Sequence, residues 1–540
     1  GANAVSITDR NGEFRIMARE GDQLEFSYIG YQTLTLQLDQ RRILEILMEE
    51  DSLVLEEVVV VGYGTMRKSD VTGAISSIRE NEIREVPVAN INQALQGRLA
   101  GVQVNQTSTR PGQTGQIRIR GSRSLNASND PLIVVDGIPF DGSMNDLNTG
   151  DITGVDVLKD ASATAIYGAR GANGVILITT NRGQAGKPKV SYSGFGGVKE
   201  VARKYKVFDA EEFIKLRQIA GAFTNMPQED AFYATGDETN WQDLMYQPGY
   251  VTQHDLNVSG GTDNAVYSAG GGYYKESTIL PGQDFSRISL RASVDTKLGK
   301  YIRLGMSTQN GYTVTNGESA SFMYQLVTLS PIAPAYDDEG NPVLQPVYPN
   351  DNYYNPLLVL NENSWAQQRI RFNSFNTLFG EVNFTPDFRY RLNVGLNYRQ
   401  DNYGHFYGSE TPFQDGESSE AVVRNGLGLG WTMEHLLYFD KTFADRHKLN
   451  LTALFSMQEN KSFHSYMKAM DMVADYVQYF NLGLYNADKG SIQVPANQQG
   501  YYRTALMSGM FRLNYGFDNR YMLTATIRAD GASVLSEGRK

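Results

Sequence analysis

From about residue 186 onward, apolar and polar side chains alternate along one long segment after another. In "RISLRASVDTK", one face carries Ile288, Leu290 and Val294, and the other carries Arg287 and Arg291. The same alternation recurs in "YIRLGMST", "RLNVGLNYRQ" and "KLNLTALFSM". Because successive side chains of a β-strand point to opposite faces, this period predicts about ten strands of one large antiparallel sheet.

Two architectures share this period. In a soluble β-sandwich the apolar face is a core and connections are short at both ends. In an outer-membrane barrel the apolar face meets lipid, the polar face meets a wet lumen, and short turns alternate with long loops. Here the tight turn at Pro386 and Asp387 contrasts with the long stretch of residues 317–368, and residues 426–443 exceed usual sandwich strands. The pattern favours a transmembrane barrel.

Composition excludes several functions. The net charge of -11 argues against a nucleic-acid partner, because phosphate binding requires basic surface. The sequence has no cysteine, which rules out thiolate catalysis, disulfides and Cys-ligated zinc. The sequence contains no run of about 18 apolar residues, so it predicts no membrane-spanning helix. For the basic cluster of Arg118, Arg120 and Arg123 we expect salt bridges to an acidic wall around it rather than a nucleic-acid site.

Catalytic and metal motifs are not found. The five histidines are scattered, and alternation places Glu434 and His435 on opposite faces of one strand. "YDDEGNP" lacks the spaced ligands of a calcium loop and predicts a hairpin turn. No nucleophile elbow or ordered Ser/His/Asp set can be singled out. We therefore expect neither enzyme activity, nor a cofactor, nor a bound metal.

Residues 151–183, "DITGVDVLKDASATAIYGARGANGVILITTNRG", look at first like a βαβ unit with a phosphate-binding loop. The glycines, however, follow the short helix expected over about residues 161–167, and a helix C-terminus disfavours anions. A dinucleotide loop needs its glycines before the helix. Gly168 suits the position after the helix, and residues 175–180 form a strand. The stretch predicts strand, short helix, glycine corners and strand.

The remaining segments are shorter. Residues 1–50 show short alternating strands typical of a small β-sandwich. A helix is expected at Ile91, Leu95 and Leu99, and two strands are expected to turn at Asp136 and Gly137. The valine run at residues 58–61 follows several acidic residues. It is either a buried strand of the sandwich or an extended segment that offers its backbone to a partner's sheet edge.

"PLIVVDGIPF" and residues 151–183 together closely resemble the plug-domain signature of SusC/RagA-type TonB-dependent outer-membrane transporters. "LEEVVVVGYGTMRKSDVTGAIS" resembles the segment before the plug, and "PAYDDEGNP", "DNYYNPL" and "RADGAS" resemble barrel segments of the same family. The resemblance implies a TonB box at Glu57, Val58, Val59, Val60 and Val61. The plug-signature positions are Asp136, Gly137, Lys159, Asp160, Tyr167, Gly168, Arg170, Gly171, Asn173 and Gly174.

The implied fold is mainly β. A carboxypeptidase-regulatory-like sandwich at residues 1–50 precedes a TonB-box region and linker at 51–66, an α+β plug at 67–185, and the first part of a transmembrane barrel at 186–540. Relatives have about 22 barrel strands, roughly twice the number visible here, and no signal peptide is evident. We therefore expect the sequence to be a fragment.

The resemblance also implies a function. TonB, energised through ExbB–ExbD, would pull the plug and admit a large nutrient, with a SusD-like surface lipoprotein as a lid. The barrel would contact lipid of a Gram-negative outer membrane, and the N-terminal domains would be periplasmic. The expected cargo is an oligosaccharide, with peptides as the alternative. The rivals are a soluble glycan-binding β-sandwich adhesin and a secreted carbohydrate enzyme.

Candidate cargo contacts lie in residues 317–368, which are rich in aromatic and amide side chains suited to stacking on sugar rings. They are Tyr336, Tyr348, Tyr353, Tyr354 and Trp365. The alternative is that these aromatic residues pack against the lid protein or the barrel rim.

Overall fold

The computed structural model describes residues 6, 8, 12–27, 34–38, 43–48, 58–60, 62, 65–67, 74–85, 91–106, 108, 110–113, 115–126, 128–160, 164–221, 227–318, 323–347, 354–414, 416–518 and 520–535. The chain forms two compact units. The first comprises residues 1–59 and 65–71, and the second comprises residues 60–64 and 72–540.

The first unit contains a small antiparallel pair, β1 (Gln23–Phe26) and β2 (Leu34–Gln37). Leu24 is buried, and the ring of Phe14 meets that of Phe26 edge-on at 5.3 Å between centroids. These contacts agree with the predicted alternation. A single β1–β2 pair does not establish a sandwich, so the sandwich stays a prediction.

The plug is built around a five-stranded sheet in the second unit. Its order is β5 (Ile75–Arg79), β10 (Ile152–Leu158), β11 (Val175–Thr180), β8 (Leu132–Val135) and β9 (Ile138–Pro139). Only the β11–β8 pair is parallel. A second pair, β6 (Val102–Asn105) with β7 (Gln116–Ile119), and the helices α1 (Glu80–Arg84) and α2 (Ile91–Leu95) pack against the same apolar core.

Two predicted plug elements differ in extent from the structure. The helix that starts at Ile91 ends at Leu95, and Leu99 lies in the following turns, where it is still buried. Residues 161–163 lie outside the described residues, and a 3-10 helix, η4 (Ala165–Asn173), follows them. Two helical stretches meet at Gly168, whose φ of 61° and ψ of -143° are not helical, so Gly168 follows the first stretch as predicted, whereas Gly171 lies in the second stretch.

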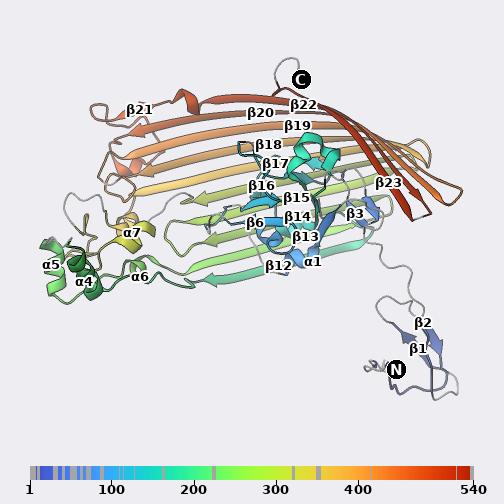
Figure 1. Cartoon of the computed structure of the whole chain (residues 1–540), viewed down its shortest axis with the longest axis horizontal. Helices are drawn as coiled ribbons and strands as arrows, with labels where there is room; N and C mark the ends of the chain where they lie inside the picture. Colours follow the sequence, from blue (N-terminus) through green and yellow to red (C-terminus); the bar gives the residue numbers. More distant parts are fainter. Residues whose placement is uncertain are drawn as a thin grey trace. The chain divides into compact units, whose positions relative to one another are not determined.

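The rest of the second unit is a curved antiparallel sheet of 12 strands (Figure 1). Its path runs through β12 (Gly186–Lys199), β13 (Gly249–Gly261), β14 (Ala265–Ser277), β15 (Asp284–Leu298), β16 (Ile302–Asn316), β17 (Trp365–Asn383), β18 (Phe388–Tyr407), β19 (Glu420–Phe443), β20 (His447–Met470), β22 (Gly500–Phe517) and β23 (Tyr521–Ala532). The short β21 (Ser491–Gln493) pairs with β20. The sheet is open at β12 and β23, so it forms part of a barrel wall.

Connections between these strands alternate in length, as the sequence predicts. The short ones are residues 262–264, 299–301, 384–387, 444–446 and 518–520, and the longer ones are residues 200–248, 278–283, 317–364, 408–419 and 471–499. The longer ones carry α4 (Ala210–Ala220), α5 (Pro227–Ala234), α6 (Trp241–Met245) and α7 (Met323–Thr328), which gather at one end of the sheet (Figure 1). We call this end the loop end.

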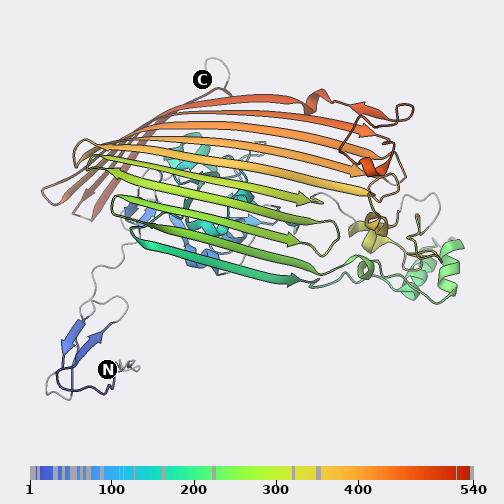
Figure 2. The same ribbon diagram turned by 180° about the vertical axis from the view of Figure 1, so that it is seen from behind.

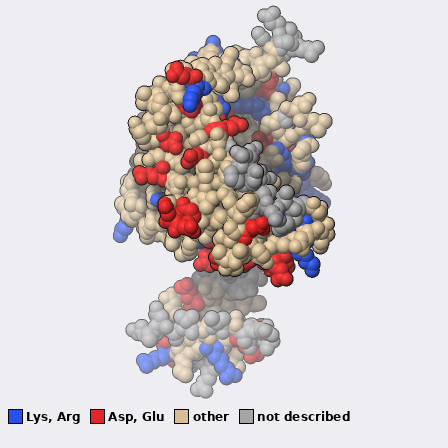
Figure 3. Space-filling model, turned by 90° about the vertical axis from the view of Figure 1, so that its left-hand side faces the viewer, with Lys and Arg blue, Asp and Glu red and all other residues tan. Residues whose placement is uncertain are grey.

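The loop end has its own packing and surface character. Side chains of residues 241–245, 323–335 and 356–360 form a separate apolar cluster there. Acidic side chains, drawn in red, are spread over this face (Figure 3). Residues 317–364 and 408–419 contain no Lys or Arg.

Burial along β15 is the reverse of that in a soluble protein. The polar residues Arg287 and Arg291 are 1% and 3% exposed, whereas the apolar residues Ile288 and Leu290 are 50% and 60% exposed. The plug lies against the polar face of the sheet (Figures 1 and 2). The apolar face is therefore not a core, which contradicts the sandwich alternative and confirms the predicted barrel-type sheet.

No helix in the described part of the chain has the length and hydropathy that a membrane crossing requires.

A charge placed on the exposed apolar face tests this assignment. In the full-length protein folded into bilayers, Leu290→Arg is expected to lower the free energy of unfolding by about 2–4 kcal/mol, because the guanidinium would have to enter hydrocarbon. Urea titration monitored by the gel shift of the folded barrel measures this. Thr296→Arg, on the same face near the short turn, is the control and is expected to cost less. Equal, negligible effects for both would contradict a lipid-facing surface.

Candidate functional site

The two signature residues at the β8–β9 turn form a tight corner. Asp136 and Gly137 have φ values of 50° and 92°, as a two-residue hairpin turn with left-handed geometry requires. Both carboxylate oxygens of Asp136 accept hydrogen bonds from Thr180, at 3.0 Å from its N–H and 2.6 Å from its hydroxyl. Arg182 then lies 4.0 Å from Asp136 and 3.3 Å from Asp295 of β15. The corner is thus linked to the barrel wall.

Lys159 fastens the end of β10 to neighbouring segments. Its ammonium group donates to the hydroxyl of Ser76 and to the carbonyl of Ala100. Burial lowers the pKa of Lys159, the nearby Arg120 lowers it further, and Asp160 opposes both. The buried ammonium group is therefore a structural hydrogen-bond donor.

Asp160 and the basic cluster pair within the plug. Arg120 lies 2.6 Å from Asp160, and Arg118 lies 2.6 Å from Asp130. The backbone N–H of Ala74 donates to Asp160 and, with Arg120, lowers the pKa of its carboxyl group. The prediction that these arginines bridge to an acidic wall is wrong for Arg118 and Arg120. Their partners are residues of the plug. The sequence alone does not show which acidic residues the fold brings close to them.

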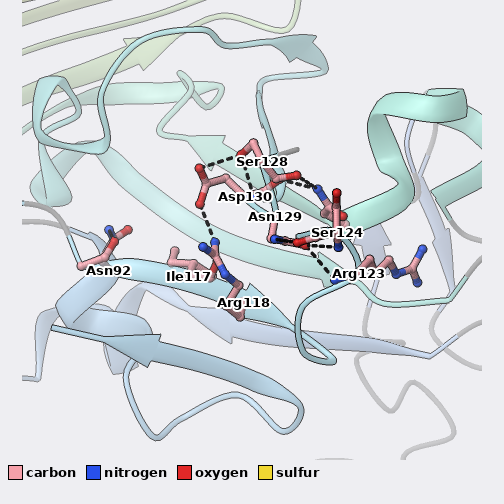
Figure 4. Close-up of polar contacts among 10 residues, drawn as sticks. Asn92, Ile117, Arg118, Arg123, Ser124, Ser128, Asn129 and Asp130 are labelled. Atoms are coloured by element: carbon pink, nitrogen blue, oxygen red, sulfur yellow. Dashed lines mark hydrogen bonds and ion pairs between the residues drawn. The ribbon is translucent and has the colours of Figure 1, made fainter. Parts of the chain in front are cut away.

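The loop that follows β7 is closed by side-chain hydrogen bonds (Figure 4). The side-chain oxygen of Asn129 accepts from the backbone N–H groups of Arg123 and Ser124, at 2.7 and 2.9 Å. The amide of the signature residue Asn173 donates to the carbonyl of Ser128 at 2.8 Å, so η4 holds this loop. The signature asparagine thus acts inside the plug.

The η4 helix packs against β23 at its kink. Gly168 has φ 61° and ψ -143°, and a Cβ built there would lie 2.0 Å from a carboxylate oxygen of Asp530. The N–H of Ala169 donates to the same carboxylate at 3.3 Å, and Arg528 donates to the carbonyl of Ile166. Glycine is required here both for the backbone angle and for the close approach.

The other signature residues in and next to η4 also pack against, or hydrogen-bond to, the plug or the wall. Tyr167 is buried, and this burial raises the pKa of its hydroxyl above the usual value. Arg170 donates to the side-chain oxygen of Gln458 in β20. A Cβ at Gly171 would lie 2.6 Å from the carbonyl of Thr164, and one at Gly174 would lie 2.6 Å from Ile119. The η4 segment is therefore fitted closely to both plug and wall.

One deeply buried contact between plug and wall was not predicted from the sequence. Arg287 of β15 donates at 3.1 Å to the carbonyls of both Asn145 and Leu147, and at 3.2 Å to the side-chain oxygen of Asn148. On the same strand, Arg291 lies 3.5 Å from a carboxylate oxygen of Asp151. We call residues 144–151 the plug seam. The signal in the sequence was the pair of arginines on the polar face of β15.

Glycines in the wall make room for the plug seam. A Cβ at Gly272 would lie 2.5 Å from the side-chain amide of Asn148, and one at Gly311 would lie 2.9 Å from the carbonyl of Asp146. At Gly270 it would lie 3.0 Å from a carboxylate oxygen of Asp151. The run "GGGYY" at residues 270–274 is thus partly a docking surface for the plug, and only Gly271 of its glycines lies on the opposite face.

Buried carboxyl groups give the plug seam its electrostatic character. Burial raises the pKa values of Asp146 and Asp151. The Ser143 N–H, at 2.9 Å, acts against this effect at Asp146, and the charge of Arg291 does so at Asp151. The arrangement holds charges in a dry interface, where each depends on its partner for solvation. It can act as a seal between plug and wall, and nothing in it indicates bond-breaking chemistry.

The predicted TonB box lies partly outside the described residues, which omit Glu57 and Val61. Residues Val58–Val60 form strand β3, which pairs with β4 (Thr65–Arg67) in a separate two-stranded sheet. The run is therefore extended, but among the described residues it does not join the β1–β2 sheet. Both interpretations of the run, as a sandwich strand or as a partner-binding segment, therefore stay predictions.

The three described aromatic candidates for cargo contact differ in exposure. Tyr354 is buried, and the indole N–H of Trp365 donates to the carbonyl of Val359 at 2.9 Å within the loop-end cluster. Tyr336 is 44% exposed, and Tyr348 and Tyr353 lie outside the described residues. Packing is thus the observed role of Trp365 and Tyr354 here.

Two smaller expectations can be compared with the structure. Asp337 accepts hydrogen bonds from the N–H groups of Glu339 and Asn341, and Tyr336 pairs with Pro342, so "YDDEGNP" is a hairpin. Within the described ranges, no three His, Asp or Glu side chains are close enough to hold a metal ion.

Removing the guanidinium of Arg287 should loosen the plug. Arg287→Met leaves buried carbonyls and acidic groups without a charged donor, and we expect it to weaken plug docking by about 2–5 kcal/mol. Hydrogen exchange at residues 144–151 of the full-length receptor measures the change. Arg303→Met, which removes a half-exposed ion pair with Asp295, should cost less than about 1 kcal/mol. If Arg287→Met left the exchange protection of residues 144–151 unchanged, the claim that Arg287 stabilises plug docking would be contradicted.

Comparisons with known proteins agree with this architecture. Residues 67–175 match the family described as TonB-dependent Receptor Plug Domain. The whole chain is 30% identical to TonB-dependent receptor P26 of Formosa agariphila over 555 residues, and 30% identical to TonB-dependent receptor SusC of Bacteroides thetaiotaomicron over 593 residues. It spans 54% and 55% of these relatives, about half of their length.

A solved structure shares the fold. A chain of the RagAB peptide importer in its open-open state superposes with a TM-score of 0.76 at 21% identity, over 89% of this chain and 57% of that one. At this identity the likeness concerns the fold alone. The plug match and the two receptors similar over the whole chain show that this chain is similar to TonB-dependent receptors such as SusC, and the RagAB chain shares its fold.

Proposed function

We propose that the chain forms the plug and part of the barrel wall of a receptor that imports a large nutrient across the outer membrane. The observation that carries the proposal is the docking of the plug on the polar inner face of the wall, with Arg287 bonded to Asn145 and Leu147. A lumen filled by such hydrogen-bonded contacts does not pass a large solute. Import then requires work on the plug, which suits an energised transporter rather than a passive pore.

The proposed source of this work is TonB, driven by the proton gradient through ExbB–ExbD. Its binding segment is Glu57 to Val61. Strand β3 pairs with β4 along one edge, and strand addition by TonB would use its other edge. Backbone hydrogen bonds along such an edge give a mechanical grip that depends little on side-chain identity.

The proposed organisation keeps the limits predicted from the sequence: a sandwich at residues 1–50, the TonB-box region at 51–66, the plug at 67–185 and barrel strands from 186. The N-terminal domains would be periplasmic. The exposed apolar face of the sheet would contact outer-membrane lipid, and a SusD-like lipoprotein would cover the loop end. No step in this scheme makes or breaks a covalent bond, and the relatives matched are receptors rather than enzymes.

We infer an oligosaccharide as the cargo, chiefly from the resemblance to the family. A peptide is the alternative, and the name of the RagAB peptide importer supports it. Among the described aromatic candidates, Tyr336 has a side chain exposed enough to stack on a sugar ring. The plug signature residues act mainly within the plug, so their proposed role is to keep it assembled rather than to bind cargo.

Deletion of residues 57–61 from the full-length receptor tests the proposal. Uptake should fall to the background level because the grip is lost, whereas binding of cargo at the cell surface should persist because plug and wall are intact. Radiolabelled cargo uptake and binding at low temperature measure the two quantities separately.

A matched pair of point variants separates strand addition from side-chain recognition. Val59→Pro removes one backbone donor and disfavours strand pairing, so it should reproduce the deletion. Val59→Thr retains both the N–H and the β-branched shape and should import normally. Normal uptake by the deletion variant would refute the TonB assignment.

A further inference from the structure

Charged side chains interrupt the otherwise apolar outer face of β20 and β22. Side chains at odd positions of β20 face outward, because even positions such as Gln458 and Asn460 reach the plug residue Asp141 on the inner face. Glu459 and Lys461 are therefore on the outer face. Lys461 pairs in register with Arg503 of β22, so three charges meet on the side of the sheet that faces away from the plug.

These charges lie where the apolar band ends. Below them, toward the short turns, the outward pairs are Met457 with Met507, then Phe455 with Gly509 and Ala453 with Phe511. Met507, Phe511 and Phe455 are exposed. One step above the charges, toward the loop end, the rings of Phe463 and Tyr501 lie 4.7 Å apart, as aromatic residues do at a membrane interface. The cluster therefore marks the boundary between hydrocarbon and head groups at the loop end.

The cluster has more positive charge than its own carboxylate neutralises. The ammonium group of Lys461 lies 3.0 Å from one carboxylate oxygen of Glu459, and the Nε of Arg503 donates to the other at 2.9 Å. Glu459 is largely covered by its neighbours, whereas the side chains of Lys461 and Arg503 are well exposed. A single cation would neutralise Glu459, so the second leaves a net charge of one beside the lipid head groups.

We propose that Lys461 and Arg503 bind the phosphate group of a glycolipid in the outer leaflet of the membrane. An ammonium group and a guanidinium one strand apart can donate to different oxygens of one phosphate, and both retain N–H groups that Glu459 does not use. The acyl chains would then lie along the exposed methionine and phenylalanine side chains below. The inference rests on the proposed outer-membrane location, but not on TonB or on the identity of the cargo.

Native mass spectrometry of the full-length receptor, extracted from its own outer membrane in mild detergent, tests this directly. Lys461→Gln/Arg503→Gln should retain about 30-fold less phosphorylated glycolipid than the parent, since each of the two basic residues contributes on the order of 1 kcal/mol near a head group. Lys441→Gln is the matched control. Lys441 is also an outward cation, but it lies near the short turns and pairs with Asp387 at 3.0 Å. It should leave glycolipid retention unchanged.

Two further arms identify the ligand and the role of the cluster. After delipidation, the parent should rebind lipid A that carries phosphate but neither dephosphorylated lipid A nor inorganic phosphate. Glu459→Gln should retain at least as much glycolipid as the parent, because it raises the net positive charge of the cluster. If the cluster were purely structural, the double variant Lys461→Gln/Arg503→Gln would retain as much glycolipid as the parent. Equal retention by the double variant and the parent, or equal rebinding of dephosphorylated lipid A, would overturn the proposal. Cargo uptake by the double variant reports on import separately.

Discussion

The polar inner face of the sheet must find hydrogen-bonding partners, and the plug supplies them. Arg287 illustrates the constraint: its guanidinium is almost completely buried, and carbonyls of Asn145 and Leu147 accept its hydrogen bonds. A buried charge without such partners would cost several kcal/mol. Gly270, Gly272 and Gly311 carry no side chain that would clash with the plug seam, so the seam can approach Arg287 and Arg291 closely. Sheet and plug therefore depend on each other for their polar groups.

The same alternation separates two environments across a single layer. Leu290 and its neighbours on the outer face are exposed in the chain alone and are suited to hydrocarbon, while Ser289 and Arg291 face the plug. Long connections at one end pack into an apolar cluster around Trp241 and Leu357, so that end has a folded rim rather than loose loops. A rigid wall, a fitted plug and a folded rim support the proposal that import would require work on the plug.

The sequence predicted the local geometry of strands and turns well. Alternation assigned Arg287 and Leu290 to opposite faces, and the Asp136–Gly137 corner follows from the conformations that these residues adopt easily. The face of a strand side chain and the conformation of a tight turn both depend on only a few neighbouring residues. The choice between barrel and sandwich was also correct, because loop lengths and the polar face carry that information. The boundaries of domains and the TonB box stay predictions.

Long-range partners could not be predicted in the same way. Arg118 and Arg120 were expected to reach the wall, yet they pair with Asp130 and Asp160 inside the plug. A second helical stretch follows the non-helical Gly168, and Asp530 and Arg528 of β23 contact the chain at this kink, which the local sequence does not reveal. Trp365 suggested a sugar platform by its type, but its indole is used in loop packing. Residue type alone does not show which neighbours a fold brings close.

Cysteine labelling along β15 tests the central claim that one face of the wall is covered by plug and the other by lipid. This chain has no cysteine, so single substitutions at Ser289, Ser293, Leu290 and Val294 report without background from residues 1–540, in a full-length receptor from which any cysteine outside them has been replaced. The account predicts that Leu290→Cys and Val294→Cys react only with a membrane-soluble maleimide. Ser289→Cys and Ser293→Cys should react with a water-soluble maleimide only after the plug is deleted. Rapid labelling of Leu290→Cys by the water-soluble reagent, or of Ser289→Cys with the plug in place, would contradict it.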